Sequence, residues 1–356
     1  MAHYDSQKSD SSVVGPLLAA KQPLLTEPMS MTLIAERPTA GFLQLYQKDD
    51  DALRTELSEG LLAPQAATSP KFLYDALGSK LFEAICELPE YYPTRTEAAI
   101  FDTHLSDIVE SAGQGGVLID LGAGNCAKAA RLFPVLRPRD YVPVDISVDF
   151  LRGAVEGLRQ RFPRIRMTGL GMDFSRSLAL PAFVPEDGRL FFYPGSSIGN
   201  FAPEQALSLL TAMRTACGDD GGLLIGVDLA KDARLLNAAY DDALGVTASF
   251  NLNLLRHLNG LLGADFDVRD WRHRAFWNPA QGRVEMHLEA RRHVVVRWQG
   301  GQRHFREGER IHTENSYKYT RQGFLQLLER AGFPAARTWT DEREWFLVCH
   351  ARAARG

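Results

Sequence analysis

The sequence predicts an α/β fold in which a doubly wound parallel sheet is interrupted by an inserted α+β domain. From residue 116 to residue 231, short apolar segments alternate with helical segments, as strands and helices do in a parallel sheet. Residues 232–318 break this pattern with a long helical segment followed by alternating strands. A helix and a strand then resume the first pattern up to the C-terminus.

The composition is that of a globular protein. The 356 residues are 45% hydrophobic and 24% charged, and the net charge of −4 predicts no binding to nucleic acid or to an anionic membrane. No apolar run approaches the ~18 residues of a transmembrane helix, and the polar, acidic N-terminus is a poor signal peptide. Without a heptad pattern or a large apolar stripe, a monomer is expected.

Cysteine and histidine usage predicts a reduced setting without a metal. The four cysteines are far apart and form no CxxC pair, so neither a zinc knuckle nor a disulfide framework is indicated. The expected location is cytoplasmic. The nine histidines include no HExxH motif. Residues 1–30 are predicted to form a flexible tail.

Helices are predicted before the sheet. The first is expected over residues 49–63, where aspartates precede the apolar positions and Gly60 lies near the end. Residues 70–101 hold a helical run, a proline-bounded break with the sequence LPEYYPTRTE, and a helix that starts at Thr94 or Thr96. The paired tyrosines of the break are either a packed turn or part of a site.

Strands and helices then follow in alternation. Between residues 116 and 231 they are strand 116–124, helix 125–136, strand 141–147, helix 149–162, strands 165–174 and 189–201, helix 203–217 and strand 222–231. The insertion is predicted to hold a helical stretch over 238–262 and strands over 274–278, 283–298 and 310–319. A helix over 320–333 and a strand over 344–353 complete the chain.

A glycine turn ends the first predicted strand. In DLGAGNCAK, Gly122 and Gly124 let the backbone approach a ligand closely, but Ala127 stands where a dinucleotide fingerprint has its third glycine. S-adenosylmethionine has no phosphate and needs only the close approach and polar anchors. The shortened turn, with the Ala-Gly-Phe and closing strand near the C-terminus, favours S-adenosylmethionine over NAD.

Acidic residues end the next two strands. Asp145, 23 residues after Gly122, is placed to accept hydrogen bonds from both hydroxyls of a ribose. Asp173 and Phe174 offer one polar contact and one apolar face to an adenine ring. NAD would share Gly122 and Asp145, and each acid singly is explained as well by a turn or cap. The three strand ends together indicate an adenosyl cofactor.

The last strand of the insertion, RIHTENSYKYT, has a polar face. Because side chains alternate along a strand, Glu314 and Ser316 are expected on one face, with His312 and Lys318 further out on it. The residues alone leave open whether this face is a solvated edge or the floor of a pocket.

Six motifs stand out along the chain: FLYDALGSKLFEAICELPEYYPTRTE, PGSSIGNF, DLAKD, AYDDALGVTASFNLNLLRHLN, RVEMHLEAR and TENSYKY. Together they resemble one known family, the histidine-specific N-alpha-methyltransferases of ergothioneine biosynthesis, and the similarity runs from about residue 40 to the C-terminus. The resemblance implies three methyl transfers from S-adenosylmethionine to the alpha-amine of L-histidine, through mono- and dimethylated forms, to hercynine. It implies a Rossmann-like class I methyltransferase domain over 31–231 and 319–356, with N-terminal helices, and an inserted substrate-binding domain over 232–318.

The resemblance also implies site residues. Cofactor contacts fall on Tyr74, Gly122, Lys128, Asp145, Asp173 and Phe174. Substrate contacts fall on Tyr91, Asn200, Tyr240, Met286, Glu314 and Ser316. Tyr74 and Tyr91 are expected to orient the amine, and no general base is identified.

The chemistry of histidine suits these residue types. Asn200, at the carboxyl edge of the sheet, and Tyr240 can donate hydrogen bonds to a carboxylate. A neutral imidazole has one donor and one acceptor, which Glu314 and Ser316 can pair, and a site built this way penalises side chains that lack them. The sulfonium lowers the pKa of a neighbouring amine by like-charge repulsion.

Two other functions stay open. Fungal N-methyltransferases of dimethylallyltryptophan share this fold family, although an indole offers a donor and no acceptor. The chain also departs from the usual valine and cysteine of the family at Asn315 and Tyr317, which are expected to point away from the pocket. A non-catalytic S-adenosylmethionine-binding protein is the second alternative, and the intact site residues argue against it.

Overall fold

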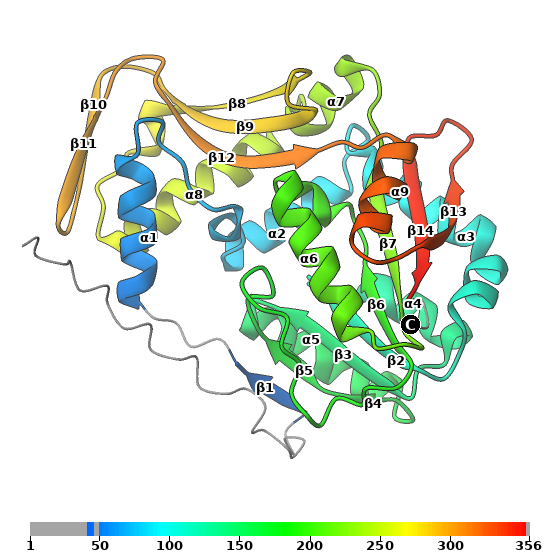
Figure 1. Ribbon diagram of the computed structural model, residues 1–356. Coiled ribbons are helices and arrows are strands. Elements are labelled where there is room, and N and C mark those ends of the chain that lie inside the picture. The colour runs from blue at the N-terminus through cyan, green and yellow to red at the C-terminus, as the bar shows by residue number, and fades with distance from the viewer. Residues whose placement is uncertain (1–40, 46–49, 354–356) are drawn as a thin grey trace, which may run out of the picture.

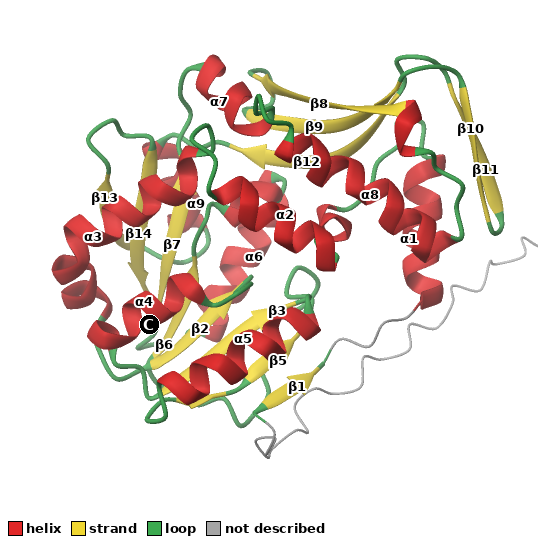
Figure 2. Ribbon diagram, turned by 180° about the vertical axis from the view of Figure 1, so that it is seen from behind, coloured by secondary structure: helices red, strands yellow, loops and turns green. Residues whose placement is uncertain are grey.

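One large sheet with a smaller sheet beside it forms the framework of the chain (Figures 1 and 2). The computed structural model describes residues 41–45 and 50–353, so the predicted tail over residues 1–30 lies outside the described residues. The strand order of the large sheet is β1-β5-β3-β2-β6-β7-β14-β13, with β4 paired to β3. Its pairs are parallel except those of β14, which is antiparallel to β7 and to β13. The predicted Rossmann-like α/β fold is confirmed.

Helices cover both faces of the large sheet. Its strands are β1 (Phe42–Gln44), β2 (Val117–Leu121), β3 (Asp140–Asp145), β4 (Arg166–Met167), β5 (Gly169–Gly171), β6 (Arg189–Tyr193), β7 (Gly222–Asp228), β13 (Ala335–Thr340) and β14 (Phe346–Arg352). One face packs on α3 (Tyr92–Ala112), α4 (Ala127–Leu136) and α5 (Val148–Arg161), and the other on α6 (Pro203–Ala216) and α9 (Arg321–Arg330). Because both faces are covered, β2, β6 and β7 are buried along their whole length and are largely apolar.

A second core lies under the smaller sheet. That sheet has the order β12-β9-β8, with β8 (Trp271–Asn278), β9 (Arg283–Ala290) and β12 (Arg310–Tyr317), and a hairpin of β10 (Val294–Trp298) and β11 (Gly301–Phe305) extends from it. Four helices and two short turns pack beneath: α1 (Asp50–Leu62), η2 (Pro70–Leu73), α2 (Ala76–Cys86), α7 (Ala233–Tyr240), α8 (Val246–Leu262) and η4 (Val268–Asp270). α1 and α2 thus share a core with the insertion, although they precede the large sheet in sequence.

Several elements differ from the sequence prediction. The helical stretch expected over 238–262 is two helices, because the Asp242 carboxylate accepts the first backbone N–H groups of α8 and Gly245 adopts a positive φ before it. α3 begins at Tyr92 rather than at Thr94 or Thr96, since a proline is tolerated in the first turn of a helix. The strand expected over 283–298 is two strands, and β1, β11 and β13 were not predicted.

The insertion rejoins the large sheet at the carboxyl end of β7. There the backbone N–H of Tyr319 donates to the carbonyl of Asp228 at 3.1 Å, and that of Ala230 donates to the carbonyl of Tyr319 at 2.9 Å. The short turn η3 (Ser197–Asn200), which follows β6, packs against the end of β12. Gly199 permits this approach, because a Cβ at that position would lie 2.8 Å from the carbonyl oxygen of Tyr317.

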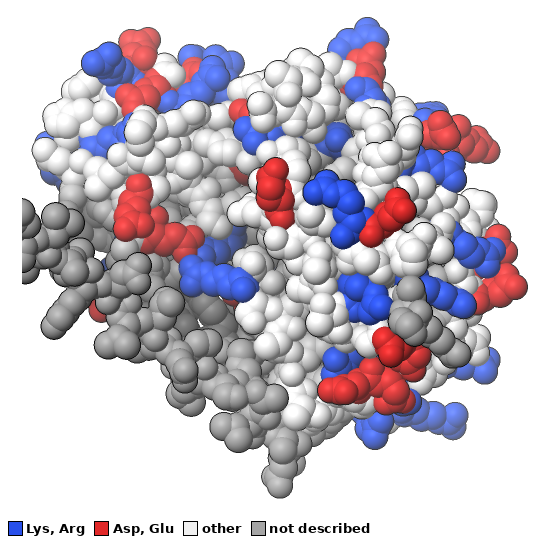
Figure 3. Space-filling model, viewed as in Figure 1, with Lys and Arg blue, Asp and Glu red and all other residues white. Residues whose placement is uncertain are grey.

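The visible surface carries charges of both signs. In Figure 3, acidic and basic side chains are interspersed and do not gather into one large patch of a single sign. Among the residues that the structure describes, no helix combines the length and apolar character needed to span a membrane.

Candidate active site

The glycine turn after β2 forms an open cradle. Gly122 and Gly124 have φ values of 67° and 53°, and a Cβ on either would meet no atom within 4 Å. This left-handed backbone favours glycine, and the empty space beside it can admit a ligand against the main chain. The Asp145 carboxylate, at the end of β3, accepts the N–H of Gly124 at 2.9 Å and that of Ser147 at 2.8 Å. It is therefore held rigidly at the rim of the cradle.

Beyond β5, the acid and the aromatic predicted for adenine lie at the same edge of the sheet. Asp173 Oδ1 accepts the backbone N–H of Ser175 at 3.2 Å. The buried Oδ2 atom has no hydrogen bond, and its ion-pair partner Arg176 lies 3.5 Å away. Phe174 packs edge-to-face on Tyr193, with ring centroids 5.9 Å apart. An unsatisfied carboxylate oxygen beside an aromatic ring fits an adenosyl group.

Lys128, a further predicted cofactor residue, forms an ion pair with an acidic residue that the sequence analysis did not single out. Its Nζ lies 2.6 Å from Glu97 Oε2, and Glu97 Oε1 accepts the backbone N–H of Gly195 at 2.7 Å. Glu97 is a buried residue of α3 and ties α4 to the loop after β6. Glu97 lies in the quoted motif LPEYYPTRTE, but nothing in that motif indicates its partners.

Aromatic rings form a cluster in the core beneath the smaller sheet. Tyr74 contacts Phe82 and Phe250 edge-on, Phe82 contacts Tyr91, and Tyr91 contacts Tyr240, with ring centroids 5.4–6.2 Å apart. Phe82 and Phe250 were not predicted as site residues. The backbone carbonyl of Tyr74 accepts the Ser147 hydroxyl at 3.3 Å, which joins this cluster to the loop after Asp145.

Burial keeps the phenols of this cluster neutral. It raises the pKa of Tyr74 well above the usual value, and the Glu314 carboxylate is the next cause. It likewise raises the pKa of Tyr91, with Tyr240 as the next cause. Both hydroxyls are therefore suited to orient a ligand and are poor proton acceptors at neutral pH.

Glu314 and Ser316 share one face of β12, as predicted. Glu314 pairs with Met286 of β9, and Ser316 pairs with Val284, so Met286 lies on this face too. The Glu314 carboxyl is buried, and its Oε2 atom has no hydrogen-bond partner among the described residues. Burial raises the pKa of this carboxyl to about 7, although the Lys318 ammonium opposes the rise. A buried acceptor without a partner indicates that a ligand supplies the donor.

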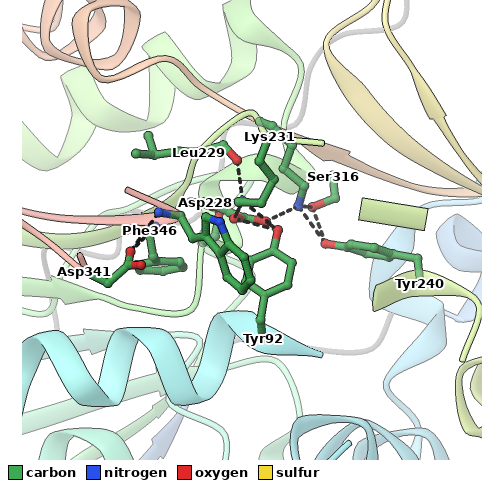
Figure 4. Close-up of polar contacts among 11 residues, drawn as sticks. Tyr92, Asp228, Leu229, Lys231, Tyr240, Ser316, Asp341 and Phe346 are labelled. Atoms are coloured by element: carbon green, nitrogen blue, oxygen red, sulfur yellow. Dashed lines mark hydrogen bonds and ion pairs between the residues drawn. The ribbon is translucent and has the colours of Figure 1, made fainter. Parts of the chain in front are cut away.

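Ser316 belongs to a buried polar network that also includes Tyr240 and Asp228 (Figure 4). The Tyr240 and Ser316 hydroxyls are 2.7 Å apart, and Lys318 Nζ lies 2.9 Å and 2.8 Å from them. The same ammonium forms an ion pair with Asp228 Oδ2 at 2.7 Å. Sequence reasoning left Lys318 unassigned and did not single out Asp228, because only the fold brings the two together.

Asn200 lies close to this face but not at the end of a strand. It ends η3 in the loop after β6, whereas the prediction placed it at the strand end itself. Its carboxamide makes no hydrogen bond within the part of the chain that the structure describes. The neighbouring Gly199 packs on β12, with its Cβ position 3.5 Å from Ser316 Oγ, so the half-buried Asn200 follows a point where the loop after β6 approaches this face.

His312 does not share the face of Glu314, contrary to the prediction. The β12–β9 register shifts between His312 and Glu314, and such a bulge inserts a residue and reverses the alternation. His312 therefore joins Glu285 and His287 on the opposite face, where the three could hold a metal ion. Glu285 is already paired with Arg283 at 2.8 Å, and His312 with Asn315 at 2.8 Å. These partners account for the cluster as a structural one.

Comparison with known proteins identifies the family of this chain. Residues 53–353 match a family model described as histidine-specific methyltransferase, SAM-dependent. The chain is 38% identical over 298 residues to a histidine N-alpha-methyltransferase of Mycolicibacterium smegmatis, covering 82% of this chain and 92% of that protein. It is 29% identical over 305 residues to ergothioneine biosynthesis protein 1 of Neurospora crassa, covering 79% of this chain and 32% of that protein. An S-adenosylmethionine-dependent methyltransferase structure from Clostridium acetobutylicum aligns with a TM-score of 0.45 at 12% identity, over 78% of this chain and 96% of that one.

Proposed function

Since this chain belongs to the family of S-adenosylmethionine-dependent, histidine-specific methyltransferases, we propose that it methylates the alpha-amine of L-histidine three times, to hercynine. The family establishes a methyltransferase that uses S-adenosylmethionine and acts on histidine. What we propose beyond this is that the amine is methylated three times, that mono- and dimethylated histidine are intermediates, and that the site residues have the roles given below. The observation that carries it is the unsatisfied Oε2 atom of the buried Glu314, on the same face as Ser316.

The cofactor residues are proposed on the edge of the large sheet. When bound, S-adenosylmethionine supplies an electrophilic methyl group. The open space at Gly122 and Gly124 supports close contact between backbone and cofactor. Asp145 keeps lone pairs beyond the two backbone N–H groups it accepts, and these suit ribose hydroxyls. The unsatisfied oxygen of Asp173 suits the amino group of adenine.

Lys128 and Phe174 have supporting roles in this proposal. Phe174 offers an aromatic ring to the adenine and is held in place by its T-shaped contact with Tyr193. Lys128 is paired with the buried Glu97, whose other oxygen holds the backbone of Gly195. We assign Lys128 to the polar end of the cofactor site. There, through Glu97, it fixes the loop after β6 that contains Gly195.

The imidazole is proposed to lie on the Glu314 and Ser316 face. Glu314 accepts a hydrogen bond from the ring N–H, and Ser316 pairs with the other ring nitrogen. Met286, from the neighbouring strand on the same face, packs on the ring. A substrate without these two nitrogens leaves buried polar groups unpaired, which costs about 1–3 kcal/mol for each group. This pairing disfavours an indole, so we retain histidine and not tryptophan as the substrate.

The amine and carboxylate are proposed to lie toward Tyr91, Tyr240 and Asn200. The amide of Asn200 is the donor for the carboxylate, and Tyr240 borders this end of the pocket through its ring contact with Tyr91. The neutral Tyr74 and Tyr91 hydroxyls orient the amine toward the methyl group, and alignment of this kind contributes roughly 7 kcal/mol or more in favourable cases. Because both phenols have raised pKa values, neither is proposed as the general base. The reaction ends when the third methyl group consumes the amine lone pair.

Methyl transfer to a panel of amino acids tests this function. Purified protein with S-adenosylmethionine is offered L-histidine, its mono- and dimethylated forms, and tryptophan, and products are resolved by mass. Hercynine is expected from histidine and from both intermediates. No turnover of any compound would contradict the enzymatic function, and preference for tryptophan would contradict the substrate.

A further inference from the structure

The buried ammonium of Lys318 donates to three oxygen acceptors beside the substrate face. Its side chain is inaccessible to solvent, and its Nζ lies 2.7 Å from Asp228 Oδ2, 2.8 Å from Ser316 Oγ and 2.9 Å from Tyr240 Oη. A lysine ammonium has three N–H donors and no acceptor. Each donor therefore meets one oxygen, and Lys318 accepts nothing in return.

Counting hydrogens in this network leaves one hydroxyl hydrogen without a protein acceptor. The Tyr240 and Ser316 hydroxyls are in hydrogen-bond contact at 2.7 Å, and that contact consumes one of their two hydrogens. A phenol is a stronger acid than an aliphatic alcohol, so Tyr240 is the donor in it. Ser316 Oγ then accepts from Tyr240 and from Lys318, which occupies both of its lone pairs. The Ser316 hydrogen remains for a ligand.

We infer that Lys318 is a positioning residue that makes Ser316 an obligatory hydrogen-bond donor, so that the pocket selects a neutral imidazole with an unprotonated nitrogen facing Ser316. The inference rests on the proposed function and names the protonation state of its substrate. With Glu314 accepting from the N–H of the ring, one tautomer satisfies both contacts. An imidazolium would place an N–H against an oxygen without a free lone pair, beside a buried cation.

The surrounding charges maintain this arrangement. Burial by itself lowers the pKa of Lys318, but the Asp228 carboxylate and Tyr240 raise it above its usual value, so the ammonium stays charged. Asp228 also binds Lys231 Nζ at 2.5 Å and accepts the Tyr92 hydroxyl at 2.7 Å. The inference therefore assigns the Tyr240 hydrogen to Ser316 while histidine is bound, so that the amide of Asn200, and not Tyr240, donates to the substrate carboxylate.

The same carboxylate provides a matched control. Lys231 is a second buried lysine on Asp228. Among the described residues, its hydrogen-bond partners are Asp228, Tyr92 and the carbonyl of Leu229, and they do not include Tyr240 or Ser316. Lys231→Met removes a cation from the same buried carboxylate and leaves the contacts of Ser316 intact. A general loss of packing or charge in the network would affect both lysine variants alike.

Nitrogen-15 NMR of ring-labelled histidine bound to the full chain with S-adenosylhomocysteine tests the inference. In the unaltered protein and in Lys231→Met, one ring nitrogen should be protonated and the other unprotonated, even at pH 6. The apparent pKa of the bound imidazole should lie at least about one unit below the usual value near 6.5. In Lys318→Met, Ser316 regains a lone pair, and that pKa should rise to the free value or above it.

A second variant keeps the test decisive if Lys318→Met does not fold. Ser316→Ala removes the oriented donor and should also raise the pKa of the bound imidazole, and adding Lys318→Met to it should cause no further rise. An imidazolium bound to the unaltered protein at pH 6, or equal values in Lys318→Met and Lys231→Met, would overturn the inference. Failure of the unaltered protein to bind histidine would instead overturn the proposed function.

Discussion

Carboxyl groups at the site differ in their surroundings at the scale of single residues. Asp145 accepts two backbone N–H groups, so its charge is compensated by the main chain. Glu314 is buried with one oxygen unpaired, and burial raises its pKa to about 7. Glu285 lies on the opposite face. Burial by itself raises the pKa of this carboxyl, but its pairing with Arg283 lowers the pKa to about 2. These contrasts make separate predictions for each acid.

Glu314→Gln should stabilise the ligand-free protein at alkaline pH. Because the folded-state pKa is raised from 4.5 to about 7, the folded state binds the proton more tightly than the unfolded chain. Stability is full below pH 4.5 and falls as pH rises through 7, by a loss on the order of 3 kcal/mol. Glutamine does not titrate and avoids this loss. Urea unfolding at pH 5 and pH 8.5 measures the difference.

The matched control for that prediction is Glu285→Gln. The depressed pKa of Glu285 means that its contribution is present above pH 4.5 and is lost as pH falls through about 2. Its removal should therefore destabilise the protein at pH 8.5, opposite in sign to Glu314→Gln. A Glu314→Gln protein with the same pH dependence as the parent would contradict the buried, unpaired state of Glu314.

Asp145→Ala should weaken binding of the cofactor more than binding of the substrate. It removes two acceptors for ribose hydroxyls and the partner of the Gly124 N–H, and a loss of about 1–3 kcal/mol corresponds to roughly fivefold to more than a hundredfold in affinity. Calorimetric titration with S-adenosylhomocysteine measures this loss. Asp149→Asn, at an exposed position of α5, is the control, and an unchanged affinity in Asp145→Ala would rule out the ribose role.

At the scale of elements, the substrate face depends on how β12 is held. The bulge before Glu314 turns His312 away, and the turn η3 packs on the end of the strand at Gly199. Both features are local departures from regular structure that place a side chain. The pocket is therefore sensitive to backbone changes at η3 that touch no ligand.

Gly199→Ala should lower histidine affinity while sparing the cofactor site. Its Cβ would lie 2.8 Å from the Tyr317 carbonyl oxygen and 3.5 Å from Ser316 Oγ, so η3 and β12 must move apart. We expect at least a tenfold loss for histidine, measured by calorimetry with S-adenosylhomocysteine present. Gly153→Ala, in α5 with open space around its Cβ, should leave both affinities unchanged. Equal losses for both ligands in Gly199→Ala would indicate general unfolding instead.

At the scale of the whole molecule, the site lies where two cores meet. The cradle belongs to the large sheet, whereas the aromatic cluster and the Glu314 face belong to the core that α1, α2 and the insertion share. Hydrogen bonds join α2 to α8, as between Asp75 and Asn253 at 2.7 Å. We therefore propose that the substrate-binding domain over 232–318 functions together with the N-terminal helices. Asp228 links this unit to β7 through Lys318.

Asp228→Asn should destabilise the whole protein. The change removes the negative charge shared by two buried ammonium groups, and breaking a buried ion pair costs about 3–5 kcal/mol. Denaturant unfolding measures this loss, and histidine affinity should fall with it, since Lys318 loses its anchor. Asp219→Asn, at an exposed position, is the control. A variant as stable as the parent would contradict the linking role of this carboxylate.

Short-range patterns predicted the fold and several residues of the candidate site. The apolar strands, the Gly122 turn and the acids at Asp145 and Asp173 could be predicted because each depends on residues close together in sequence. The alternation of β12 was predicted correctly from Glu314 onward, since period-two alternation holds wherever the strand is regular. The family motifs added the residues that no local pattern connects, such as Tyr91 and Asn200.

By itself, then, the sequence determined a Rossmann-like methyltransferase with a glycine cradle and a polar face at Glu314 and Ser316. Only the tertiary structure decided that His312 leaves this face and that Lys318 orients Ser316. It also decided that Glu97 holds Lys128. The physical reason is the separation along the sequence between the residues that determine each feature. A bulge depends on the register of a partner strand, and buried ion pairs join residues far apart in the chain. Such contacts leave no periodic signal in the sequence that could predict them.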